Sequence, residues 1–353
     1  MTLAAQRMRT QGLVEPIGRV KDVVHRLVGL QAQDDWVAAY AIRPRALSTV
    51  DAEAVSKADG LICTWVMRGT LHLVTREDAG WLVALLGPRF IAKQRARRHQ
   101  LGLTDELLRE ALPIVRDAVP ATRPEIASAV RKRGLALPEG QAEAHLVAVA
   151  AMSGLIHRTA AGYAPLPKGP KAPDDPLSEL ARRYFAGYGP AGAEDFAAWS
   201  GLPLTDARRA FAAAGFDHHG EAKAVRSAPD AEAPATDHDA RAAGGQGRRR
   251  VSRGGAGEAL PVRLLGHFDP WLLGYKDRSF TLDAKHAKHI QRGGGFLQPL
   301  IVADGRVVGT WSRDRKGNVV PHSFGGKLPD LDAEIADLAR FFRRAGEPGT
   351  PRP

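Results

Sequence analysis

The sequence contains a single cysteine, Cys63, among its 353 residues. One thiol cannot form an intramolecular disulfide or supply a multi-cysteine zinc site, and such sparing use of cysteine is typical of a reducing compartment. Long apolar runs are also missing. No stretch approaches the roughly 18 uncharged apolar residues of a membrane-spanning helix, and the first residues lack the apolar core of a signal peptide. We therefore expect a cytoplasmic protein with no membrane segment.

Acidic residues are in the minority, because 39 Asp and Glu stand against 50 Lys and Arg, for a net charge of +11. A basic protein attracts polyanions, and nucleic acid is the usual one, although the same charge also fits a merely soluble protein. The length predicts two or three domains, since a single core seldom grows much past about 250 residues. If the partner is DNA, the expected location is the nucleoid.

Helical and strand patterns recur in three approximate copies along the chain. The first, residues 1–87, has short helical segments followed by two strands, 61–67 and 70–74, joined through Arg68-Gly69. Helices followed by a two-stranded ribbon are typical of a winged-helix unit. The pattern returns in residues 88–170 and, without a clear wing, in 175–217, which predicts three tandem winged-helix units.

The remaining sequence divides into a linker and a second kind of domain. Residues 218–259 hold almost no large apolar side chain and are rich in Gly, Ala and charge, which predicts a flexible linker. Residues 260–345 contain short apolar runs, an Asp-Gly hairpin turn at 304–305 and a final helix over 329–344. We expect a β-barrel-like domain here, so the predicted fold class is α+β.

The pair Gln31 and Gln33 lies between two helical patterns and precedes Asp34 and Asp35. The plain interpretation is that these polar residues close one helix and open the next, with the carboxylates as N-cap and first-turn residues. The functional interpretation is that the two side-chain amides form a catalytic element. Asp34 and Asp35 are then competing candidates for activating water or stabilising positive charge.

A basic stretch separates the first two units, with five cations between residues 89 and 98. These side chains could follow a phosphate backbone, or could simply form a solvated helix face. The DNA-contacting candidates here are Lys93, Arg95, Arg97 and Arg98. No metal site is expected, because His286 and His289 have no cysteine or paired carboxylate beside them and read as packing residues.

Four blocks in order give the chain a family resemblance that runs from about residue 3 to residue 342, the linker excepted. The sequence resembles the AlkZ/YcaQ family of bacterial DNA glycosylases, whose catalytic motif is Gln-x-Gln in one branch and Gln-x-Asp in the other. This chain has the former. The blocks are Gln31-Ala32-Gln33, Thr64-Trp65-Val66-Met67-Arg68-Gly69-Thr70-Leu71-His72, Gly189-Pro190 with Trp199-Ser200-Gly201-Leu202, and Phe268-Asp269-Pro270 with Asp277-Arg278 and Asp304-Gly305-Arg306.

The resemblance implies three winged-helix units and a β-barrel arranged as a C-shaped surface for duplex DNA. It assigns catalysis to Gln31 and Gln33, and it brings Arg68, His72 and Arg76 near the lesion. The implied partner is double-stranded DNA carrying alkylated purines, bound by a monomer that needs no cofactor.

The chemistry of glutamine restricts the substrate. An amide has no useful pKa and cannot act as a general base, but it can position a water molecule and surround developing charge. A purine alkylated at N7 carries a positive charge, so it leaves as a neutral base without help from an acid. The pair therefore suits cationic N7-alkylguanine or N3-alkyladenine and not neutral lesions.

Two questions stay open at this level. A non-catalytic winged-helix regulator or architectural protein would show the same charge and repeats, and differs in not needing the glutamine pair and in commonly forming dimers. The source of the lesion is equally open, between general alkylation repair and self-resistance to a DNA-alkylating natural product, as is the unhooking of interstrand crosslinks.

Overall fold

The computed structural model describes residues 1–34, 36–217, 259–291, 293 and 296–343. Asp35 and nearly all of the predicted linker lie outside these ranges. The described chain is a mixed α+β structure built on two open sheets, which agrees with the predicted class. Within the described part of the chain, no helix combines the length and the apolar composition that crossing a membrane requires.

The first unit begins with short helices and then turns into a strand where the sequence predicted the end of a helix. After α2, Val28 and Gly29 adopt positive φ angles of 59° and 126°, which breaks the helix and redirects the chain. Leu30 and Gln31 then pair with the strand that contains His72. The helices of this unit are α1 (Leu3–Thr10), α2 (Val20–Arg26), α3 (Val37–Ile42), the 3-10 turn η1 (Arg43–Arg45) and α4 (Ala52–Ser56).

A five-stranded antiparallel sheet joins the first and second units, with the strand order β1-β3-β2-β4-β5. The link is the pairing of Cys63 in β2 with Arg158 in β4. The wings predicted for two separate units are thus parts of one hydrogen-bonded sheet. Its strands are β1 (Leu30–Gln31), β2 (Leu61–Trp65), β3 (Leu71–Thr75), β4 (Ile156–Thr159) and β5 (Gly162–Pro165), with the 3-10 turn η2 (Met67–Gly69) between β2 and β3.

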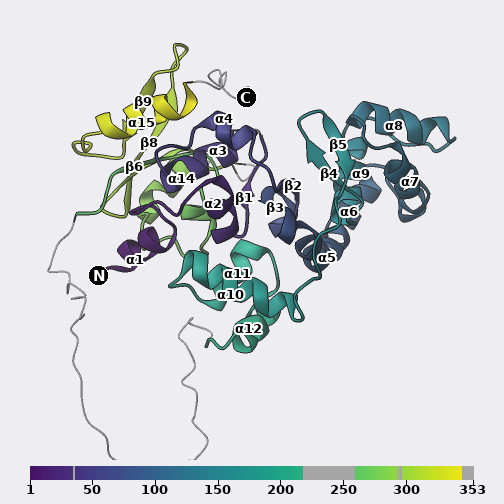
Figure 1. The fold of residues 1–353 in the computed structure, drawn as a ribbon, viewed down its shortest axis with the longest axis horizontal. Coiled ribbons are helices and arrows are strands. Elements are labelled where there is room, and N and C mark those ends of the chain that lie inside the picture. Colours follow the sequence, from purple (N-terminus) through teal and green to yellow (C-terminus); the bar gives the residue numbers. More distant parts are fainter. Residues whose placement is uncertain (35, 218–258, 292, 294–295, 344–353) are drawn as a thin grey trace, which may run out of the picture.

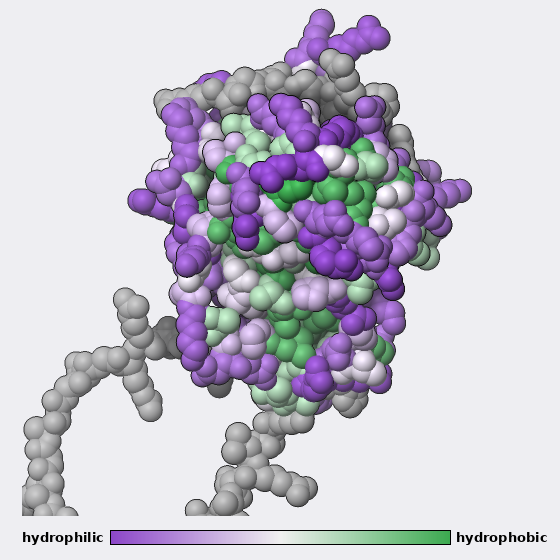
Figure 2. Space-filling model, turned by 90° about the vertical axis from the view of Figure 1, so that its right-hand side faces the viewer, coloured by the Kyte–Doolittle hydropathy of each residue, from purple (hydrophilic) through white to green (hydrophobic). Residues whose placement is uncertain are grey.

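The second unit also shares a helix with the first. The predicted boundary at residue 87 cuts through α5. At this position α5 lies directly against the end of α9, since a Cβ on Gly87 would lie 1.9 Å from the carbonyl oxygen of Met152. In Figure 1 this unit stands apart at the right, and its end carries hydrophilic side chains around apolar patches (Figure 2). Its helices are α5 (Arg76–Lys93), α6 (Arg95–Gln100), α7 (Asp105–Ala118), α8 (Arg123–Lys132) and α9 (Gln141–Met152).

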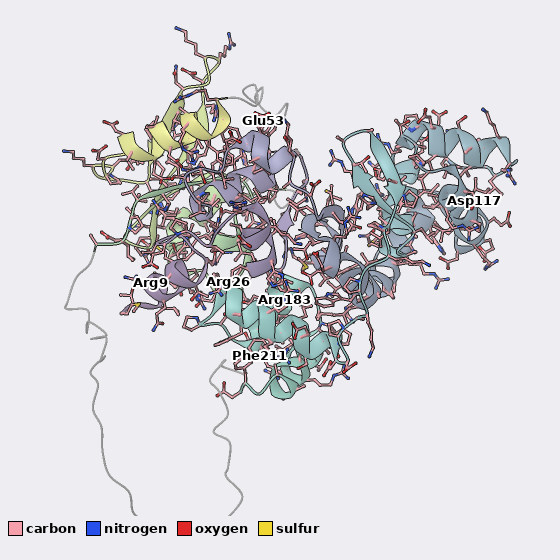
Figure 3. All side chains as sticks on the ribbon, viewed as in Figure 1. Arg9, Arg26, Glu53, Asp117, Arg183 and Phe211 are labelled. Atoms are coloured by element: carbon pink, nitrogen blue, oxygen red, sulfur yellow. The ribbon has the colours of Figure 1, made fainter. Side chains whose placement is uncertain are left out.

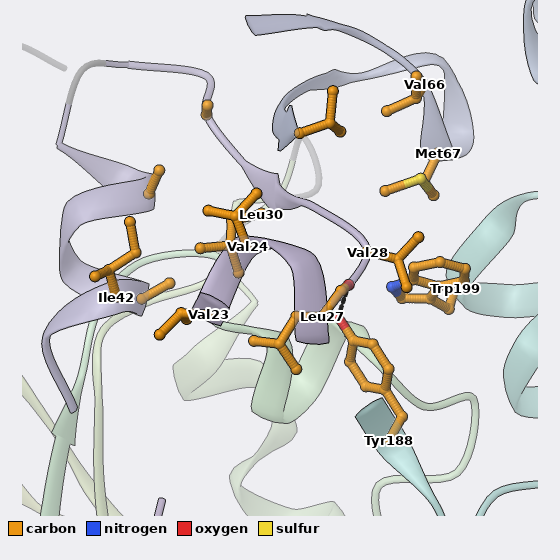
Figure 4. Close-up of a cluster of buried hydrophobic side chains, with 14 of the residues drawn as sticks. Val23, Val24, Leu27, Val28, Leu30, Ile42, Val66, Met67, Tyr188 and Trp199 are labelled. Carbon is orange, nitrogen blue, oxygen red and sulfur yellow. Dashed lines mark hydrogen bonds between the residues drawn. The ribbon is translucent and has the colours of Figure 1, made fainter. Parts of the chain in front are cut away.

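The third unit packs its helices against the first unit. Figure 4 shows the Tyr188 hydroxyl donating to the carbonyl oxygen of Leu27 (3.2 Å), with Val28 beside Trp199. On another side of the contact (Figure 3), Arg183 donates to Asp78 at 2.5 Å. The helices are α10 (Pro176–Tyr188), α11 (Ala193–Ser200) and α12 (Leu204–Ala213), close to their predicted bounds.

The C-terminal part forms an open sheet with the order β6-β7-β8-β9. Among the described residues β6 pairs only with β7 and β9 only with β8, so the sheet is open and the predicted β-barrel-like domain is not shown to close into a barrel. The hairpin turn is confirmed: Asp304 and Gly305 have φ angles of 48° and 74°, as an Asp-Gly turn requires. The elements are β6 (Arg263–Leu265), α13 (Pro270–Leu273), η3 (Ala284–His286), α14 (Ala287–Ile290), β7 (Leu300–Ala303), β8 (Arg306–Arg313), β9 (Val319–Ser323) and α15 (Asp332–Phe342).

A buried ion pair fastens this C-terminal part to the first unit. The guanidinium of Arg45 donates to both carboxylate oxygens of Asp269, at 2.9 and 2.7 Å, and both side chains are fully buried. Arg45 also donates to the side chain of Gln11, whose amide donates in turn to Tyr275. Because every charge here is paired, the two parts are held in one arrangement.

Candidate active site

Gln31 lies on an edge strand of the sheet, in a row of three polar side chains. It stands opposite His72 in β3, and His72 stands opposite Thr64 in β2. Paired residues of neighbouring strands point to the same face. All three are buried, with exposed fractions of 7%, 2% and 0%. The expectation that the glutamine pair ends a helix is therefore wrong, because the chain leaves α2 before this point and Gln31 belongs to β1.

Arg68 holds the side chain of Gln31 in place. Its Nη2 donates to Gln31 Oε1 at 3.0 Å, while Nη1 donates to the carbonyl oxygen of Trp199 in α11 at 2.5 Å. Its backbone has a positive φ of 58°, in the turn between β2 and β3. Burial lowers the pKa of the Arg68 guanidinium to about 10. Arg68 was predicted to contact DNA. In the structure its guanidinium also has a structural role, because both of these hydrogen bonds are made to other residues of the protein.

His72 is a neutral imidazole. Its Nδ1 lies 2.8 Å from the carbonyl oxygen of Thr70, which can only accept, so Nδ1 carries the proton. Burial, and then the nearby charge of Arg68, lowers the pKa of His72 to about 3. An imidazole that stays neutral at physiological pH cannot supply a proton as an imidazolium. His72 therefore stays uncharged beside Gln31, opposite it in the neighbouring strand.

Gln33 is exposed and lines a pocket of about 520 Å³. A volume of this size falls in the range of small-molecule sites. The side chain of Gln31 is buried, whereas Gln33 lies two residues after β1 ends and is exposed to solvent. The described residues around the pocket are Gln33, Trp65, Gly69, Thr70, Leu71, Arg123, Arg158 and Tyr163.

Of the eight described lining residues, only Gln33 was among the predicted site residues, and Gly69, Thr70 and Leu71 belong to the block that carried the family resemblance. Arg123, Arg158 and Tyr163 come from the second unit, and Trp65 from the end of β2. Trp65 belongs to the block that carried the family resemblance, so a signal existed for it. The other three depend on the pairing of β2 with β4, for which the sequence holds no local signal.

Asp34 lies just before α3 and contacts the first backbone N–H groups of that helix. Its Oδ1 accepts from the backbone nitrogens of Trp36 and Val37, both at 2.9 Å. Its carboxylate thus accepts from backbone N–H groups at the start of α3, although the N-cap residue of that helix is Trp36 and not Asp34. Direct participation of Asp34 at the lesion stays a prediction, and Asp35 lies outside the described residues.

The basic stretch divides between inward and outward side chains. Arg98 is only 2% exposed and donates to the carbonyl oxygen of Ile91, so it is removed from the predicted DNA-contacting set by burial. Arg95 is exposed but pairs with Asp105, and Arg97 donates to Gln141. Of the predicted cations here, Lys93 is exposed at the end of α5.

Arg76 is exposed as the first residue of α5, directly after β3. Leu71, at the other end of that strand, lines the pocket. Four strand residues lie between the two positions, so the distance is five steps of about 3.3 Å, on the order of 15 Å. The structure therefore does not bring Arg76 to Gln33, and any contact with DNA would be outside the pocket.

The two histidines of the C-terminal part pack on an aromatic ring, as predicted. The ring of His286 stacks on Phe324 with centroids 4.5 Å apart, and that of His289 lies 5.7 Å from the same ring. Among the described residues, no group of three or more His, Cys, Asp or Glu could hold a metal ion.

Comparisons with known proteins match most of the chain. The family model for DNA glycosylases of the AlkZ-like type matches residues 24–341. A protein of Streptomyces sahachiroi named interstrand DNA cross-link repair glycosylase is 30% identical over 370 residues, covering 95% of this chain and 94% of its own. The structure of the Streptomyces sahachiroi DNA glycosylase AlkZ matches with a TM-score of 0.69 and 26% identity, over 96% of this chain and 95% of that chain.

The match spans the units, the pocket and the C-terminal sheet together. A non-catalytic regulator is therefore set aside, and the chain is an enzyme of the glycosylase type. The residues that form the pocket and hold Gln31 all fall inside the matched range. The chain belongs to the AlkZ-like DNA glycosylase family.

Proposed function

We propose that this enzyme is a monofunctional glycosylase that acts as a monomer and hydrolyses the N-glycosidic bond of cationic N7-alkylated purines in duplex DNA. The observation that supports this most is the character of the pocket beside Gln33. Among its described lining residues none is Asp, Glu or His. Burial also raises the pKa of Tyr163 above its usual value. These groups offer no acid or base that titrates near neutral pH.

A pocket of this kind suits only a leaving group that needs no proton. In an N7-alkylguanine nucleotide the bond between C1′ and N9 breaks with its electron pair moving into the purine. The positive charge of the base is thereby cancelled, and the base leaves neutral. Positive charge passes to the sugar as an oxocarbenium-like species, which water attacks at C1′. A neutral purine would need protonation first.

In this proposal the two glutamines have different tasks. Gln33 lies at the pocket, where its amide oxygen accepts a hydrogen bond from the attacking water and orients it. The proton lost from that water passes to bulk solvent, because an amide cannot keep it. Gln31, held by Arg68, fixes the strand from which Gln33 extends.

Reaching C1′ in duplex DNA requires the nucleotide to leave the base stack. A base that is already damaged pairs and stacks less well, which lowers the cost of this step. We include bulky N7 adducts and interstrand crosslinks among the substrates because a relative 30% identical to this chain is named for crosslink repair. Incubation with a crosslinked duplex, followed by strand separation on a denaturing gel, tests that part.

The proposal is tested by base release from a duplex with one N7-methylguanine, under single-turnover conditions. Gln33→Ala should lower the rate by on the order of 100-fold, the scale seen when one positioned hydrogen-bonding group is removed. Gln6→Ala, an exposed glutamine on α1, is the matched control and should keep the wild-type rate. If wild-type enzyme releases no N7-methylguanine, or if Gln33→Ala releases it normally, the proposal is wrong.

A further inference from the structure

We propose that the third unit positions the glutamine motif, with Tyr188 and Trp199 as the positioning residues. Tyr188 is the last residue of α10 and Trp199 lies near the end of α11, and together they hold the short segment that leads from α2 into β1. This inference rests on the proposed function, since it concerns how Gln31 and Gln33 are kept in place for that reaction. It gives a task in the reaction to a unit that supplies none of the described residues lining the pocket.

The turn before β1 has a backbone conformation that its own residues do not favour. Val28 has a φ of 59°, which is a true outlier for a β-branched side chain, and Gly29 follows with a φ of 126°. The strand after this turn contains only Leu30 and Gln31. Strained backbone of this kind persists only where the surrounding structure determines it. The position of the glutamine motif therefore depends on contacts from outside the segment.

The first of these contacts holds the start of the segment. The Tyr188 hydroxyl donates at 3.2 Å to the carbonyl oxygen of Leu27, the residue directly before Val28 (Figure 4). Both Tyr188 and Leu27 are buried. α10 can approach this closely because Gly187 has no side chain: a Cβ there would lie 2.4 Å from the carbonyl oxygen of Arg26. The hydroxyl thus fixes the carbonyl group at which the turn begins.

The second contact holds the other end of the segment through Arg68. The Arg68 guanidinium donates to Gln31 Oε1 at 3.0 Å and to the carbonyl oxygen of Trp199 at 2.5 Å. The last carbonyl groups of a helix have no partner within it and carry partial negative charge, so the end of α11 favours a cation. Gly201, the C-cap of α11, lies directly against η2, since a Cβ there would lie 2.9 Å from the Arg68 Cα. The end of α11 thereby sets where Arg68 holds Gln31.

The two contacts belong to one packed aromatic cluster. The ring centroids of Tyr188 and Trp199 lie 5.5 Å apart, and the ring of Tyr184 lies 5.0 Å from each of them. The indole of Trp199 also lies beside Val28, so the same side chain packs on the strained turn (Figure 4). A shift of this cluster would move both ends of the segment. Misplacing a reacting group by about 1 Å can lower the rate on the order of 100-fold.

The test compares two phenylalanine variants in the same helix. Tyr188→Phe removes the hydroxyl that holds Leu27, whereas Tyr184→Phe removes a hydroxyl that donates to the carbonyl oxygen of Gly274 at 2.7 Å. Each variant keeps its ring and loses one buried hydrogen bond, so both should lower the thermal unfolding midpoint by similar amounts.

The rate of base release should separate the two variants. In single turnover on the N7-methylguanine duplex, Tyr188→Phe should lower the maximal rate on the order of ten-fold, because the motif is less well positioned. The enzyme concentration that gives half of this rate should not change, since the lost hydroxyl binds the protein and not the DNA. Tyr184→Phe should keep the wild-type values of both.

Gly201→Ala tests the contact made by α11. Its added methyl group would push the end of α11 away from η2 and the Trp199 carbonyl oxygen away from Arg68, so the maximal rate should fall. Gly215→Ala is the control, because Gly215 also has a positive φ but its Cβ would meet nothing within 4 Å. All variants are assayed at a temperature at which they are fully folded.

The inference is wrong if Tyr188→Phe or Gly201→Ala keeps the wild-type maximal rate. It is equally wrong if Tyr184→Phe slows base release as much as Tyr188→Phe, because the rate would then follow stability alone. Failure of the proposed function looks different, since the wild-type enzyme itself would release no N7-methylguanine.

Discussion

Replacing Arg68 with methionine should slow catalysis while lowering stability less than the loss of a fully paired buried arginine does. At physiological pH the guanidinium is charged in the folded and the unfolded chain, but burial lowers its folded pKa from 12.5 to about 10. At about 1.4 kcal/mol per unit, the charge costs the folded state about 3 kcal/mol at every pH below 10. Methionine removes that cost. It also leaves Gln31 Oε1 and the Trp199 carbonyl oxygen without their donor, at about 1 to 3 kcal/mol each.

These opposing effects largely cancel, so the free energy of unfolding of Arg68→Met should lie between about 1 kcal/mol above and about 3 kcal/mol below that of the wild type. Arg45→Met is the matched comparison. Arg45 is paired with both oxygens of Asp269, and removing it strands a buried carboxylate, which costs about 3 to 5 kcal/mol. Urea denaturation of the two variants measures the difference directly.

Base release tests whether Arg68 positions Gln31. With Gln31 no longer held, Arg68→Met should release N7-methylguanine roughly 10- to 100-fold more slowly than the wild type in single turnover. The reasoning about Arg68 fails if this variant keeps the wild-type rate, or if it loses as much stability as Arg45→Met.

Three further outcomes are expected. Asp34→Ala and Asp51→Ala, the latter at the N-cap of α4, should each lower the free energy of unfolding by about 1 kcal/mol and leave the rate of base release unchanged. A large loss of rate in Asp34→Ala alone would show that the Asp34 carboxylate takes part in catalysis. Because burial lowers the pKa of His72 in the folded protein to about 3, below pH 6.5 the unfolded chain binds a proton that the folded chain does not. Between pH 7 and pH 4 the free energy of unfolding of the wild type should therefore fall by about 3 kcal/mol more than that of His72→Asn, and an equal fall in both proteins would contradict this. Gly201→Ala should lower the thermal unfolding midpoint more than Gly215→Ala. Both glycines have a positive φ, but only at Gly201 would the added methyl group contact η2, at 2.9 Å from the Cα of Arg68, and equal losses in both variants would show that this contact is unimportant.

The elements that the sequence predicted best are those with strong local signals. α11 has its predicted bounds, and the Asp304-Gly305 turn joins the predicted hairpin. β1 has only two residues and shows no periodicity of its own, so it was read as the end of a helix. α7, with Pro113 inside it, was not predicted although Thr104 caps it. Local chemistry thus specified single elements but not their pairing.

The candidate site was predictable to a similar extent. The glutamine motif marked the correct segment, but it did not show that Gln31 is buried under Arg68 while Gln33 opens to the pocket. That difference arises because β1 ends between them. The contribution of Arg158 depends on a contact with Cys63, 95 residues earlier in the chain, and no local pattern records such a register. Charge alone misplaced Arg98, whose guanidinium is turned inward.

The most direct test of the chemistry compares two lesions in the same duplex with the wild-type enzyme. One duplex carries N7-methylguanine, whose base leaves neutral, and the other carries hypoxanthine, a neutral purine that needs protonation to leave. Release of each free base is followed in single turnover. If the enzyme only positions water and supplies no acid, N7-methylguanine is released and hypoxanthine is not. Comparable release of both bases would show that the site contains a proton donor and that the charge on the base does not drive cleavage.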